Sequence, residues 1–163
     1  MLHPAAAHFA VALPIISLVI GLAYLYKPSE FMSKISTRFM IFATIFLIIA
    51  FFTGKNDGSE VYPLISGEGK KLLLEHKDMG LYLLIAMGVA TAIKFFGCVK
   101  QVFKAEILAV ILLLLISGGI MYQGKIGGEL TYTYGAHVEK HSDGMDCLED
   151  PEEFLEDEEE EEE

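Results

Sequence analysis

The residues of this sequence best suited to chemistry are histidines near the ends of long apolar segments. His3 and His8 lie at the start of an apolar segment that continues to Tyr26, and His76 lies just before another such segment. Histidine is costly inside a bilayer and usually faces a cavity, a partner or a ligand. Two histidines on facing helices can supply the axial nitrogens of a haem. A structural or hydrogen-bonding role is the alternative interpretation.

Four apolar segments must position these histidines. The chain is 53% hydrophobic over 163 residues, which is typical of a membrane protein. The segments have the apolar character of membrane-crossing helices and cover about residues 5–26, 39–53, 79–96 and 105–122. The sequence therefore predicts an all-α membrane protein, a four-transmembrane-helix bundle formed by residues 1–140.

The segments that flank these spans contain turn residues and charges. Thr53-Gly54 predicts the end of the second helix, and Asp78 is an expected N-cap or first-turn acid for the third. Apolar residues among charges in 61–77 predict a separate interfacial helix that starts after Gly67. The glycine-rich segment 124–138 predicts a non-helical cap on the bundle, with Tyr132 and Tyr134 at headgroup depth.

The end of the chain is strongly acidic. Fourteen Asp or Glu and no Lys or Arg occur from Asp143 to Glu163, which leaves nine acids against twelve bases in the rest of the chain. This composition predicts a disordered tail over 141–163. The nearly neutral remainder gives no reason to expect nucleic-acid binding. The tail is solubilising in the simpler interpretation, and in the other it attracts a basic partner such as a periplasmic cytochrome c.

Four spans place both termini on one side of the membrane. The two short loops on the other side hold six bases: Lys27, Lys34, Arg38, Lys94, Lys100 and Lys104. Bases in short loops set orientation more strongly than bases in long segments, so these loops are expected in the cytoplasm. Both termini then face outward, toward the periplasm, from a bacterial inner membrane.

This topology brings all five histidines to the outer side: His3, His8, His76, His137 and His141. His8 and His76 are expected at a similar level on two helices. His3 and His8 differ by about 140° around a helix and do not form the pair that grips a small metal ion. His137 and His141 have helical pair spacing beside the acidic tail. A periplasm-facing metal-binding protein that uses His3, His8, His137 and His141 remains a further alternative.

Other polar residues indicate weaker possibilities. Tyr132 and Tyr134 could line a pocket for a quinone or another ligand, although anchoring at the membrane surface is the simpler role. Glu106 opens the fourth span and has only Lys94, Lys100 and Lys104 nearby as pairing partners. The sequence contains no activated serine or cysteine constellation and no phosphate-binding loop, so an electron carrier or accessory protein is favoured over an enzyme.

Several of these features together resemble a known bacterial membrane family, domain of unknown function 2231. The resemblance covers about residues 2–138. The matching features are Leu2-His3-Pro4, His8-Phe9, Leu13-Pro14, Thr53-Gly54, His76 and Gly127-Gly128-x-Leu130-x-Tyr132-x-Tyr134-Gly135. The opening and the Gly-Gly-x-Leu-x-Tyr segment are the most specific of these.

The resemblance implies four transmembrane helices and a distant likeness to four-helix cytochrome b proteins. A two-haem cytochrome needs histidines toward both sides, and the cytoplasmic side has none here. The expectation is therefore one b-type haem held by His8 and His76, with His3 as the substitute ligand and Tyr132, Tyr134 and His137 as possible pocket or cap residues. The protein would exchange electrons with a periplasmic cytochrome c or a quinone, alone or as an oligomer in the lipid. A non-redox scaffold or accessory subunit is the main alternative.

Overall fold

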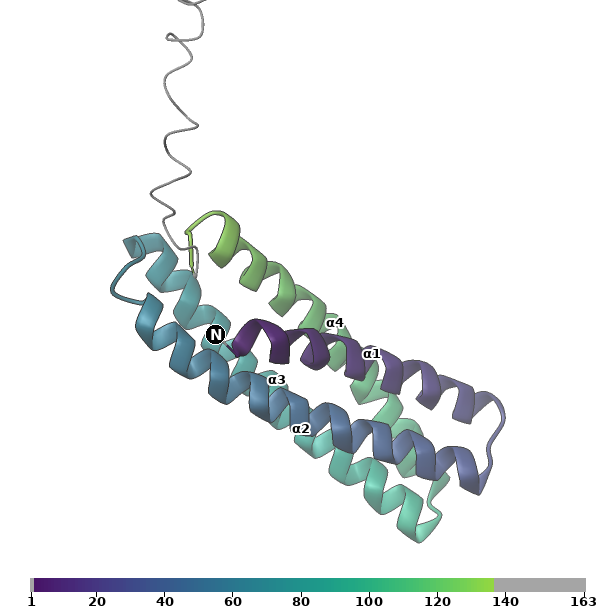
Figure 1. Ribbon diagram of the computed structural model, residues 1–163. Coiled ribbons are helices and arrows are strands. Elements are labelled where there is room, and N and C mark those ends of the chain that lie inside the picture. Colours follow the sequence, from purple (N-terminus) through teal and green to yellow (C-terminus); the bar gives the residue numbers. More distant parts are fainter. Residues whose placement is uncertain (1, 137–163) are drawn as a thin grey trace, which may run out of the picture.

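The computed structural model describes residues 2–136 and contains four long helices over that range. They are α1 (His3–Tyr26), α2 (Glu30–Val61), α3 (Gly67–Lys100) and α4 (Phe103–Tyr132). Each is long and apolar enough to cross a membrane. Each helix runs antiparallel to the next helix in the sequence, as Figure 1 shows. The prediction of an all-α, four-span bundle is confirmed.

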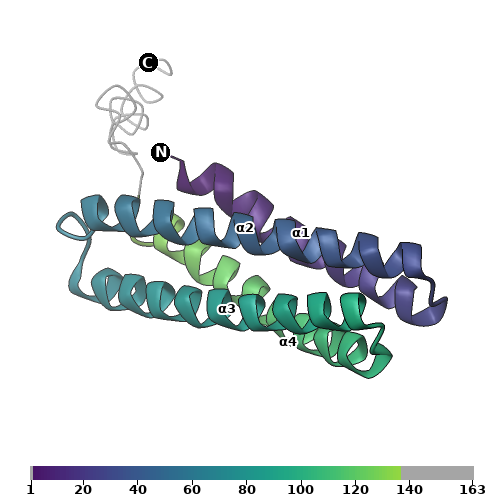
Figure 2. The same ribbon diagram turned by 90° about the horizontal axis from the view of Figure 1, so that it is seen from below.

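The two ends of the bundle differ in their connections. Residues 27–29 and 101–102 join helices at one end, which we call the short-loop end. The start of α1, the end of α4 and the 62–66 connection lie at the opposite, terminal end (Figures 1 and 2). Ser29 and Ser66 cap α2 and α3, because their side chains accept hydrogen bonds from backbone N–H groups three residues later.

Small buried residues hold the middle of the bundle together. α1 packs on α2 and α4, and α3 packs on the same two helices. The central cluster contains Ala6, Ala10, Met40, Ala43, Leu47, Ala50, Met87, Ala90, Leu113, Ile116 and Ile120. Alanines at these positions allow close approach of helices, as is usual in membrane bundles. Many large apolar side chains on the outer faces remain exposed, which suits contact with lipid.

The predicted end of the second helix at Thr53-Gly54 is wrong, because α2 continues to Val61. Gly54 serves close packing instead of a turn. A Cβ atom at this position would lie 2.7 Å from Cε1 of His3, so only glycine leaves room for that ring. The same glycine that resembles a helix stop in the sequence is a contact point between α1 and α2.

Two further predicted boundaries are also wrong. The 61–77 region does not form a separate interfacial helix, because α3 runs unbroken from Gly67, and Asp78 is an exposed residue inside it. The glycine-rich segment after 124 is helical as far as Tyr132 and not an irregular cap. Burial at helical spacing explains this result, since Ile126 and Leu130 both pack into a second cluster.

This second cluster lies at the terminal end and contains Val61, Ile65, Ile126, Leu130 and Ala136. No residue of α1 belongs to it, and α2, α3 and α4 extend past the start of α1 (Figures 1 and 2). The terminal end of the described chain is therefore a three-helix extension. The predicted tail over 141–163 and both His137 and His141 lie outside the described residues.

Candidate functional site

His3 is held firmly at the terminal end. Its ring Nδ1 lies 2.9 Å from the backbone oxygen of Ala50 on α2, and its backbone N–H donates to Asp57 at 3.4 Å. A carbonyl oxygen only accepts, so this contact places the ring proton on Nδ1. The Nε2 atom then keeps its lone pair, which is the form in which histidine binds metals.

His76 approaches the same region from α3. Its Nδ1 atom is buried and has no hydrogen-bond partner within the described chain. The ring lies against Gly127 of α4, where a Cβ would be 3.3 Å from Cε1. His3 and His76 therefore both lie at the terminal end of the bundle, on α1 and α3.

Gln123 of α4 completes this terminal histidine site. Its Nε2 donates to the backbone oxygen of His76 at 2.6 Å, while its Oε1 is buried without a partner. Buried polar atoms are nearly always hydrogen-bonded, and the exceptions need an explanation such as a bound water or ligand. Two such atoms occur on His76 and Gln123, two residues that the hydrogen bond between α3 and α4 joins.

His8 is not part of this arrangement. Its side chain is exposed, and its Nδ1 contacts the oxygen of Pro4 at 2.6 Å in its own helix. His8, the ligand preferred from the sequence, is thus bonded within α1, whereas His3, the expected substitute, contacts α2 at the terminal end. The reason is rotational, because positions 3 and 8 lie on different faces of α1.

The remaining predicted site residues lie apart from this pair. Tyr132 is 91% exposed, and the ring of Tyr134 packs on Gly69, where a Cβ would lie 3.1 Å from it. His137 lies outside the described residues. Within 2–136, no three His, Cys, Asp or Glu side chains gather into a metal-ion site.

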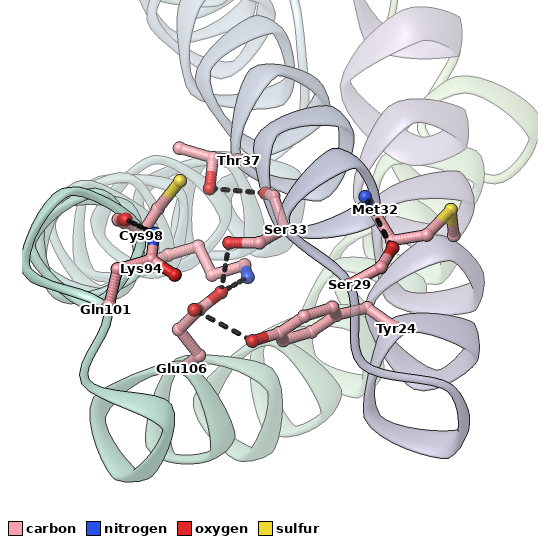
Figure 3. Close-up of polar contacts among 9 residues, drawn as sticks. All are labelled: Tyr24, Ser29, Met32, Ser33, Thr37, Lys94, Cys98, Gln101 and Glu106. Carbon is pink, nitrogen blue, oxygen red and sulfur yellow. Dashed lines mark hydrogen bonds and ion pairs between the residues drawn. The ribbon is translucent and has the colours of Figure 1, made fainter.

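A second polar site, at the short-loop end, draws one side chain from each helix (Figure 3). Glu106 of α4 accepts hydrogen bonds from the Tyr24 hydroxyl at 2.8 Å and from the Ser33 hydroxyl at 2.7 Å. It also forms an ion pair with Lys94 of α3. Both charged side chains are almost fully buried. We call these four residues the short-loop cluster.

Packing around the ion pair satisfies both charges. The Lys94 ammonium lies 4.2 Å from the centre of the Tyr24 ring, a cation–π distance. Phe103 stacks edge-on against Tyr24, with ring centres 5.9 Å apart. The carboxylate accepts from three donors, so its buried charge is compensated.

Residues 1–140 match the family model described as predicted membrane protein (DUF2231). The chain belongs to this family. The predicted resemblance is thereby confirmed, and DUF2231 membership makes this a membrane protein. No curated protein and no solved structure matches the chain. Inferences about the activity of this DUF2231 protein consequently rest on its own residues.

The short-loop cluster of this DUF2231 protein was only partly foreseeable. Glu106 had three candidate partners in the sequence, and the structure selects Lys94, twelve residues earlier across a two-residue connection. Tyr24 and Ser33 were missed, because they lie 82 and 73 positions from Glu106 in the chain.

Gly97 makes the ion pair possible. A Cβ at this position would lie 2.6 Å from Cγ of Glu106 and 3.1 Å from its backbone nitrogen. We expect Gly97→Ala to lower the free energy of unfolding by about 1–3 kcal/mol through overpacking. Thermal unfolding in detergent would measure this change.

Gly88 provides the control in the same helix, because a Cβ there would meet nothing within 4 Å. Gly88→Ala should be neutral or stabilising by up to about 1 kcal/mol, since alanine favours a helix over glycine. Equal effects of the two substitutions would contradict the packing role of Gly97.

Proposed function

We propose that this protein is a membrane electron carrier that binds one b-type haem at its terminal end through His3 and His76. The supporting observation is the presence of two imidazoles at the same end of the bundle, from α1 and α3: the tautomer of His3 leaves its Nε2 lone pair available, and Nδ1 of His76 is buried without a hydrogen-bond partner in the described chain. Imidazole nitrogens from two separate helices would be able to hold a b-type haem. The residues present therefore suit this group.

The neighbouring residues would prepare the two ligands. The Ala50 carbonyl orients the His3 ring and increases the basicity of Nε2 by accepting the Nδ1 proton. Gln123 fixes the backbone of His76, and Gly54 and Gly127 leave room for the two rings. The haem, when bound, supplies a reversible one-electron change at its iron.

The proposed electron partner is a periplasmic cytochrome c or a quinone on the terminal side. The acidic residues of 143–163 would attract a basic soluble partner, and salt would weaken that attraction. We infer that the terminal end faces outward from a bacterial inner membrane. The basic residues in and beside the two short connections favour a cytoplasmic position for the short-loop end.

This orientation is testable with cysteine labelling. In a Cys147→Ser background, Ser59→Cys at the exposed terminal end should react with an impermeant maleimide in spheroplasts. Lys100→Cys at the short-loop end should react only after lysis, and native Cys98 is buried. The reverse pattern would place the terminal end in the cytoplasm.

A visible difference spectrum tests the haem proposal directly. The purified wild-type protein, expressed with haem available, should show a reduced-minus-oxidised b-type α-band and about one haem per chain. Well-folded protein with a flat spectrum would overturn the proposal.

One observation favours a non-redox accessory subunit as the second candidate. His3 and Gln123 each bond to a backbone oxygen of a neighbouring helix, so both could serve only to join helices. This candidate predicts a colourless protein in which the same residues affect stability alone. A partner that copurifies stoichiometrically would then define the function.

A further inference from the structure

The short-loop end contains a cavity of about 330 Å³ that reaches Glu106. We propose that the buried Glu106–Lys94 pair is a proton-binding site, which exchanges its proton with water through this cavity. The site lies at the opposite end of the bundle from His3 and His76. The inference therefore goes beyond the proposed function and does not rest on haem binding.

The burial of the ion pair would be unusual if the pair served only to stabilise the fold. Lys94 is 0% exposed and Glu106 is 2% exposed, inside helices that are apolar enough to cross a membrane. Replacement of a buried ion pair by apolar residues is often neutral or stabilising, so packing alone does not require it. Paired ionisable residues within membrane helices commonly mark routes for protons or ions.

Water can reach the carboxylate from the short-loop end. The cavity is lined by polar groups that include Ser29, Ser33 and Gln101, together with Glu106 itself. A buried site holds water when it has sufficient volume and two to four polar partners, and this cavity has both. A proton donor from the aqueous phase consequently has a path to Glu106.

A second observation extends the polar path inward. Ser36 is fully buried on α2, one turn beyond Ser33, and its hydroxyl has no hydrogen-bond partner in the described chain. An ideal Cβ on Gly21 would lie 3.7 Å from this hydroxyl, so α1 leaves space beside it. An unpartnered buried hydroxyl next to the cluster indicates an additional bound water.

The chemical step is a simple proton transfer. A hydronium ion in the cavity gives its proton to a Glu106 carboxylate oxygen and leaves as water. Lys94 keeps its three protons, so the site gains one positive charge, and the reverse step restores the ion pair. The other groups that act on this proton are Tyr24 from α1, Glu30 at the cavity on α2 and buried Cys98 on α3.

Labelling with dicyclohexylcarbodiimide tests the proposal in the full-length wild-type protein, because this apolar reagent modifies protonated carboxyl groups. Peptide mass spectrometry should find a modified Glu106, and the labelled fraction should rise as the pH is lowered. An absent label at every pH at which the protein stays folded, or a label independent of pH, would overturn the proposal.

Two variants sharpen the test. Glu30→Gln removes the other carboxyl group at the cavity, and the label on Glu106 should persist in this variant. Lys94→Met removes the positive partner but leaves the Tyr24 and Ser33 hydroxyls on the carboxylate, and it should increase the labelled fraction of Glu106 at a given pH. An unchanged labelled fraction in folded Lys94→Met protein would count against the pair as the site, and the wild-type result stands if this variant does not fold.

Discussion

His3→Ala and His76→Ala are each expected to remove the haem signal, whereas His8→Ala keeps it. Loss of a residue that merely supports a metal ligand reduces affinity about 10–100-fold, so loss of a residue that would itself hold the haem should cost at least as much. His8 is exposed and contacts only its own helix, so its ring is dispensable. The haem-to-protein ratio and the α-band amplitude of the three purified variants provide the measurement.

The three variants also separate the two candidate functions. A secondary-structure spectrum and an unfolding temperature for each protein distinguish loss of ligand from loss of fold. Replacing His8 at the start of α1 changes the same helix as His3 without touching α2, which makes it a matched control. Loss of haem in His8→Ala but not in His3→Ala would show that α1 presents its other face to the cofactor.

Removal of one charge from the short-loop cluster should be the most destabilising change in the bundle. Glu106→Leu leaves the Lys94 ammonium buried without its partner, and Lys94→Met leaves the buried carboxylate with only the Tyr24 and Ser33 hydroxyls as donors. Breaking a buried pair in this way costs about 3–5 kcal/mol. The double variant, which removes both charges, should recover most of that loss. Unfolding by heat or denaturant in detergent measures all three.

The exposed pair of Lys34 and Glu30 is the control for this cycle. These residues are one turn apart on α2 and both face solvent, so Glu30→Ala should leave stability unchanged within error. If the double variant of the buried pair is as unstable as either single variant, the cluster contributes packing or hydrogen bonds that the apolar side chains cannot replace.

The number of helices and their order were predictable, because each span is a long apolar run. The helix ends were not. Gly54 and the glycines after 124 looked like stops, since the sequence shows conformational freedom but not the neighbour that needs the space. The helices also continue beyond the apolar runs at the terminal end, where Ile126 and Leu130 pack outside the predicted spans.

The candidate sites show the same limit. His3 and His8 are equivalent in type and differ only in the rotation of α1 about its axis, which interhelical packing sets. The buried residues Ala6, Ala10, Ser17 and Gly21 follow one face of that helix, and His3 continues this line. A search for small residues at helical spacing would have favoured His3. The contacts of Tyr24 and Ser33 with Glu106 depend on the assembled bundle and left no comparable pattern.

The Lys94–Glu106 pair also bears on how the protein enters the membrane during synthesis. Inserted alone, α3 would expose an ammonium near its end and α4 a carboxylate near its start. Such a charge costs about 2.5–3.5 kcal/mol at the centre of a span and less near the end of a span, where these two charges lie. Only residues 101–102 separate the two helices, so their charges can meet before either helix leaves the translocation machinery. We therefore expect α3 and α4 to insert as one neutral hairpin, with α1 and α2 already in the bilayer to receive it.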